Sequence, residues 1–137
     1  MYNILKQVAI DNSWVFTYAR RDHSNLFNEV EQVGVPHIFL DPVVIDNNFG
    51  DYNEVESTTY SGTFLLVVSS DIDEVDYDTR YQTYIKPLLE TAMGVIKADL
   101  VCTNPVTYNT WRTQEIINVF DYNLDGILVN FNITISS

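Results

Sequence analysis

The chain has 137 residues, of which 46% are apolar and 13% are aromatic, which is enough to bury the core of one domain. The chain has 7 Lys and Arg residues and 19 Asp and Glu residues, so its net charge is −12. Its surface therefore repels phosphate backbones and anionic membranes. This balance argues against a protein that binds nucleic acid tightly, and it leaves cations and basic protein surfaces as partners.

Cys102 is the only cysteine, so no disulfide can form within the chain, and a reduced, intracellular setting is expected. The first residues have neither a long apolar run nor a small-residue cleavage site, so we expect no signal peptide and no membrane span. The whole chain, 1–137, is expected to fold as a single domain.

The N-terminal half is expected to contain one helix and three strands. Apolar residues at three- and four-residue spacing predict a helix that ends near Asp11. Strands are predicted over 14–20, over 35–40 up to the stop at Asp41-Pro42, and over 58–69. The segment Asp46 to Glu56 is rich in Asn, Asp and Gly, which indicates a loop or the tip of a hairpin.

The main helix is expected to follow the acidic run Asp71 to Asp78, because apolar residues recur at helical spacing between Tyr81 and Ile96. Negative charge near a helix N-terminus stabilises it by roughly 0.3–1 kcal/mol per charge, so much of this run has a structural explanation. Pro87 predicts a kink, or the start of the regular helix, since proline lacks the amide donor.

Two strands are predicted after this helix, over 103–120 and 127–137, and the second alternates apolar and polar residues. Asp125-Gly126 between them has the composition of a hairpin turn. The expected fold is therefore α+β, with a mostly antiparallel sheet packed by a short N-terminal helix and one long central helix, in the order α-β-β-β-α-β-β.

The spacing of Asp121, Asn123, Asp125 and Gly126 matches the first half of a calcium loop. The twelfth position, however, is Asn132 where such a loop has Glu, and a strand pattern follows where a helix is needed. The turn interpretation is therefore favoured, and we expect no metal site and no cofactor.

No motif for catalysis is present in the sequence. His23 and His37 lack further ligands at metal-binding spacing, and neither a phosphate-binding glycine loop nor a nucleophile elbow occurs. The few arginines in this acidic chain are expected to pair with carboxylates within or between subunits; they include Arg20, Arg21, Arg80 and Arg112. The chain is not expected to be an enzyme.

Four short segments are spread along the chain: Tyr18-Ala-Arg-Arg-Asp22 leading to Asn25-Leu26, Phe39-Leu-Asp-Pro42, Asn118-Val-Phe-Asp121 and Asn123-Leu-Asp-Gly126. Together they resemble small structural proteins of tailed bacteriophages, in particular the tail-terminator or tail-completion class. The resemblance implies a homo-oligomeric virion ring, six- or twelve-fold, in the head-tail connector (neck) or tail. Adjacent portal, neck or tail proteins would be its partners, and the ring would assemble in the host cytoplasm.

The same resemblance implies that DNA passes through the ring without specific binding, which the negative charge favours. In such rings a long hairpin or loop of one subunit packs on its neighbour. By this analogy the contact segments are Asp46 to Glu56 and the strand Thr103 to Gln114. The interface candidates within them are Asn47, Phe49, Asp51, Tyr52, Tyr108, Trp111 and Arg112.

Two other functions fit parts of the sequence. An acidic inhibitor that mimics DNA would be a stable monomer with carboxylates spaced on one face like phosphates. A calcium-binding module would bring the oxygens of Asp121, Asn123 and Asp125 together and would be stabilised by calcium.

Overall fold

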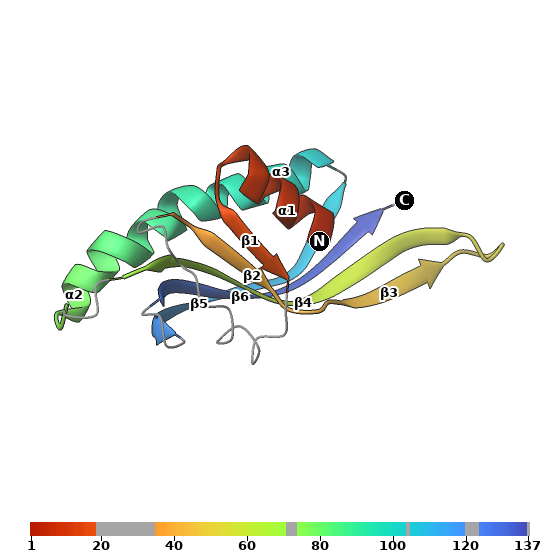
Figure 1. Ribbon diagram of the computed structural model, residues 1–137. Coiled ribbons are helices and arrows are strands. Elements are labelled where there is room, and N and C mark those ends of the chain that lie inside the picture. The colour runs from red at the N-terminus through yellow and green to blue at the C-terminus, as the bar shows by residue number, and fades with distance from the viewer. Residues whose placement is uncertain (19–34, 71–73, 104, 120–123, 137) are drawn as a thin grey trace.

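The computed structural model describes residues 1–18, 35–70, 74–103, 105–119 and 124–136. These residues form a six-stranded, mostly antiparallel sheet, and the helices lie on one of its faces (Figure 1). The predicted α+β class and the order of helices and strands are confirmed, with one strand more than expected.

The sheet has the strand order β1-β2-β4-β6-β5, and β3 pairs with β4 beside this path. Only β1 and β2 are parallel, whereas the other pairs are antiparallel. The strands are β1 (Val15–Tyr18), β2 (His37–Leu40), β3 (Val44–Phe49), β4 (Val55–Ser69), β5 (Val106–Val119) and β6 (Leu124–Ser136).

The N-terminal helix α1 (Tyr2–Asp11) buries Leu5, Val8 and Ala9, as the apolar spacing predicts. It ends at Asn12, whose side-chain amide donates to the carbonyl of Val8 at 2.8 Å. The chain then turns through positive φ at Ser13 and enters β1. The predicted first strand reached further, but residues 19 and 20 lie outside the described residues.

One continuous helix runs across the sheet as α2 (Tyr77–Arg80), η2 (Tyr81–Ile85), η3 (Leu88–Ala92) and α3 (Met93–Thr103). Asp76 caps its start, because its carboxylate accepts from the amide of Asp78 at 3.3 Å. Pro87 keeps helical dihedrals between the two π-helical stretches η2 and η3. The sequence predicted a kink or the start of the regular helix at Pro87. The helix instead passes through the proline with a π-helical stretch on each side, and the regular α-helix starts at Met93.

The main core lies between the helices and one face of the sheet. Alternate residues of β6 enter it, which confirms the predicted alternation, and so do alternate residues of β2 and β4. A smaller buried cluster occupies the opposite face of the sheet. Its members are Phe39, Leu65, Val67, Leu124 and Leu128.

The prediction of a hairpin turn at Asp125-Gly126 is wrong. Both residues lie inside β6, where they pair with Val68 and Val67 of β4. A Cβ atom on Gly126 would lie 2.7 Å from the Cα of Val67, so a glycine is needed here for the close approach of two strands. The connection between β5 and β6 falls outside the described residues.

Candidate assembly surface

A long hairpin, formed by β3 and the first half of β4, projects beyond the helices (Figure 1). Its tip is closed by backbone hydrogen bonds from Gly50 to Glu54 at 2.8 Å and from Asn53 to Gly50 at 3.1 Å. Asn53 has a φ of 64°, which asparagine tolerates better than most residues. The prediction of a loop or hairpin tip over Asp46 to Glu56 is therefore confirmed for residues 50–54, whereas the rest of the segment belongs to β3 and β4.

Strand β3 itself was not predicted. Its Asn- and Asp-rich sequence has low intrinsic strand propensity, but the long β4 supplies a partner for the backbone. Side chains add cross-strand bonds, from Thr58 to Asn47 at 3.1 Å and from Asn48 to Ser57 at 2.9 Å. The only local sign of this strand is the apolar run just before Asp46.

The hairpin leaves large apolar side chains in solvent. Tyr52 is 91% exposed and Phe49 is 61% exposed, and Val44 and Ile45 are exposed to a similar degree as Phe49. Since isolated two-stranded ribbons bury little, these side chains gain only part of the burial that a core position gives. Four of the interface candidates, Asn47, Phe49, Asp51 and Tyr52, thus lie together on an exposed projection.

The two faces of the hairpin differ. Ile45, Asn47 and Phe49 share the face on which the helices lie, because they alternate with the other residues of β3. The opposite face continues onto β6 and β5 as a hydrogen-bonded polar surface. Its contacts join Asn48 with Thr59, Thr59 with Thr134, and Asn109 with Thr134 and Asn132.

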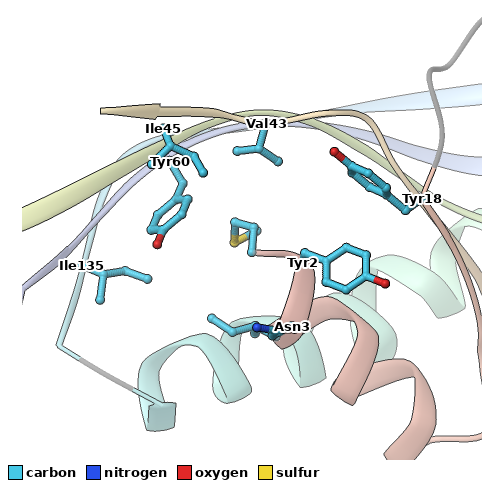
Figure 2. Close-up of a pocket in the computed structure, with 9 residues that line it drawn as sticks. Tyr2, Asn3, Tyr18, Val43, Ile45, Tyr60 and Ile135 are labelled. Carbon is cyan, nitrogen blue, oxygen red and sulfur yellow. The ribbon is translucent and has the colours of Figure 1, made fainter. Parts of the chain in front are cut away.

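A groove of about 490 Å³ lies at the root of the hairpin, between α1 and the sheet. Figure 2 shows Tyr2, Tyr18, Ile45, Tyr60 and Ile135 around it. None of its lining side chains carries a charge, and its surface is mixed, because aliphatic side chains lie next to Asn3 and to three tyrosines.

The interface candidates on β5 have different environments. Trp111 packs on its own core, with its ring 5.8 Å from that of Phe64 and with Lys97 5.7 Å above it. Tyr108 is half-buried beside Trp111, and burial raises the pKa of its phenol. Arg112 is exposed. The ring of Trp111 therefore serves the monomer, whereas Tyr108 and Arg112 remain partly accessible along β5.

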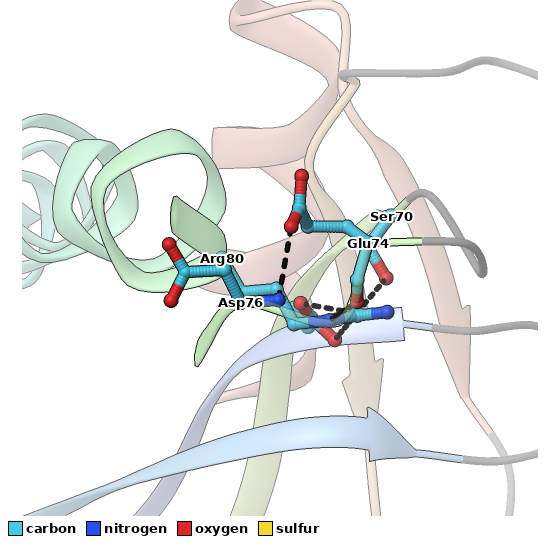
Figure 3. A network of polar contacts seen from close by, with 5 residues as sticks. Ser70, Glu74, Asp76 and Arg80 are labelled. Carbon is cyan, nitrogen blue, oxygen red and sulfur yellow. Dashed lines mark hydrogen bonds and ion pairs between the residues drawn. The ribbon is translucent and has the colours of Figure 1, made fainter. Parts of the chain in front are cut away.

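A buried polar network joins the start of the long helix to β6. Arg80 and Asp125 form an ion pair at 3.0 Å, with side chains only 1% and 0% exposed. Arg80 also donates to the backbone carbonyl of Glu74 at 2.7 Å and to the hydroxyl of Ser70 at 3.3 Å (Figure 3). The sequence predicted that some arginine pairs with an acid, but it did not indicate which one.

This network bears on the calcium hypothesis. The carboxylate of Asp125 is paired with Arg80 in the interior, where a cation would have to displace a guanidinium. Asp121 and Asn123 lie outside the described residues. Within the part of the chain that the structure describes, no cluster of three metal-ligating side chains occurs.

Of the two histidines, His37 lies in β2 and His23 is outside the described residues. His37 is buried and stacks on Phe39, with ring centroids 6.3 Å apart. Burial lowers the pKa of its imidazole, and its Nε2 atom has no hydrogen-bond partner within the described structure. This environment suits a neutral histidine in the smaller apolar cluster.

Among the described helices, none is long and apolar enough to cross a membrane. No protein-family profile matches the chain, and no curated protein matches it either.

Proposed function

We propose that this chain is a structural subunit of a tailed-bacteriophage particle that forms a ring in the neck or tail around the DNA channel. Its role would be to bury an interface with identical neighbours and with the ring proteins above and below, without catalysing a reaction.

The projecting hairpin is the observation that carries the proposal. It extends the sheet away from the core and exposes most of the side chains of Phe49 and Tyr52. Apolar residues on a protruding element are typical of a surface that is covered in an assembly. The resemblance of the sequence to tail-terminator proteins suggests which assembly.

The charge of the chain also supports the proposal. A ring of subunits that each carry −12 would repel a DNA duplex in its lumen, so DNA would pass without adhering.

The test is the mass of the purified protein in solution, measured by light scattering over a concentration series. We expect a closed oligomer, of six or twelve subunits, or an approach to one as concentration rises. The variant Phe49→Ser/Tyr52→Ser should remain folded and lose this oligomer. The matched control is Val101→Ser, which changes an exposed apolar residue on α3 and should leave the oligomer intact.

A monomer at every concentration would contradict a self-assembling ring and would favour the acidic inhibitor. Loss of the oligomer in Val101→Ser as well would show that any exposed apolar residue matters, and would contradict the role of the hairpin.

A further inference from the structure

Among the described residues, the sheet has three outer strands. β1, which pairs only with β2, and β3 lie on one side of β4, and β5 lies on the other side. Within the described structure, β3 pairs only with β4, and β5 pairs only with β6. An unpaired edge presents backbone amides and carbonyls that can bond to another strand. This inference rests on the proposed ring: we propose that β3 of one copy pairs with the first residues of β5 of the next copy, starting at Val106, so that the sheet continues from subunit to subunit at the hairpin. The pairing stops where β1 covers the side of β2.

The strand directions fit this pairing. Strand β3 is antiparallel to β4, β4 to β6, and β6 to β5, so β3 and β5 of one chain run in opposite directions. A rotation about an axis along the strands leaves these directions unchanged. It therefore brings β3 antiparallel to β5 of the neighbour and keeps the helices of both copies on the same side. Such a head-to-tail contact generates a ring when the rotation closes, and an open chain when it does not.

The side-chain faces also agree. Along the helix-covered face, one row of cross-strand partners runs Ile45, Tyr60, Ile133, Tyr108, and the next runs Asn47, Thr58, Ile135, Val106. If each row continues into the same row of the next copy, Ile45 lies opposite Tyr108 of the next copy, and Asn47 lies opposite Val106 of the next copy. Exposed Ile45 then gains an aromatic neighbour, a favourable cross-strand pair.

Charge decides between this partner and a two-fold pairing of β3 with itself. The hairpin 44–56 carries Asp46, Asp51, Glu54 and Glu56 and no basic residue, so two hairpins side by side would repel each other. Residues 105–114 include no acid, and their only charged residue is Arg112. Lys97 lies next to them, over Trp111. The acidic hairpin therefore meets no acid on the first residues of β5, whereas it would meet four acids on a second hairpin; the only acid of β5, Glu115, lies further along the strand.

A disulfide cross-link tests the pairing. In a Cys102→Ser background, which removes the exposed native thiol, the chain carries Ile45→Cys and Tyr108→Cys. Cβ atoms of directly opposite residues are about 4.5–5.5 Å apart, close to disulfide geometry. Within one chain, three strand spacings separate these residues by about 14 Å, so an internal disulfide cannot form. Mild oxidation should give a ladder of covalent oligomers on a non-reducing gel.

The matched control is Val44→Cys with Tyr108→Cys. Val44 and Ile45 are 60% and 57% exposed, but their side chains lie on opposite faces of β3. The control should give no ladder. A second pair in the same register, Asn47→Cys with Val106→Cys, should cross-link as the pair Ile45→Cys with Tyr108→Cys does. It keeps the pairing testable if Ile45→Cys itself prevents assembly.

The outcomes separate this inference from the ring. An oligomer by light scattering in which neither in-register pair cross-links, or in which the control links equally, would overturn the strand pairing and leave the ring standing. A ladder in a protein that forms open chains would support the pairing and overturn the ring. A monomer that does not cross-link would overturn both.

Discussion

At the scale of single residues, the ion pair of Arg80 and Asp125 joins two segments that are 45 positions apart in the sequence. We expect Asp125→Ala to lower the free energy of unfolding by about 3–5 kcal/mol, since it leaves a buried guanidinium without its carboxylate. Denaturant unfolding measures this. Glu90→Ala, which removes the exposed pair with Lys86, should change stability by no more than about 1 kcal/mol.

If the cost of Asp125→Ala reflects the unpaired charge, replacing both partners should restore part of the stability. The double variant Arg80→Met/Asp125→Leu should be more stable than Asp125→Ala. A double variant as unstable as the single one would contradict this explanation.

His37 should make stability depend on pH. Burial lowers the pKa of its imidazole below the ordinary value of 6.5, so the unfolded chain binds this proton more readily than the folded chain. The contribution of His37 is therefore fully present above pH 6.5 and is lost as the pH falls through 6.5 toward the folded pKa. His37→Phe should lose less stability between pH 7.5 and 5.5 than the native chain, measured by urea unfolding. Equal losses would show that other groups cause the effect.

At the scale of elements, two glycines should respond in opposite ways to the same change. Gly126→Ala in β6 should destabilise the protein by about 1–3 kcal/mol or more, because the new methyl meets the backbone of β4. At Gly94 in α3, no described atom beyond the chain neighbours and the helix's own nearby backbone lies within 4 Å of an added Cβ. Gly94→Ala should therefore stabilise the helix by roughly 0.5–1 kcal/mol. Thermal unfolding of both variants measures this. A harmless Gly126→Ala would mean that β4 and β6 can separate at this point.

At the scale of the whole molecule, the net charge should oppose assembly. Raising the salt concentration from about 0.01 M to about 0.15 M shortens the Debye length from about 30 Å to about 8 Å, which screens the repulsion between chains that each carry −12. We expect the midpoint of association, measured by sedimentation at several concentrations, to move to lower protein concentration with salt. A shift to higher concentration would show that attraction between the hairpin acids and basic residues dominates.

The sequence by itself determined the local features: α1, the long helix, β4, and the alternation of β6. These follow from periodicity, which neighbouring residues express wherever they lie in the fold. Composition also determined the charge.

Only the tertiary structure decided the features that depend on distant partners. Strand β3 forms because β4 continues beyond the core and pairs with it, although the segment itself has the composition of a loop. Asp125-Gly126 has the composition of a turn but lies in β6, because Arg80 compensates the buried carboxylate and β4 leaves no room for a side chain at Gly126. Pairing and burial are set by segments far away in the sequence, so no local pattern could reveal them.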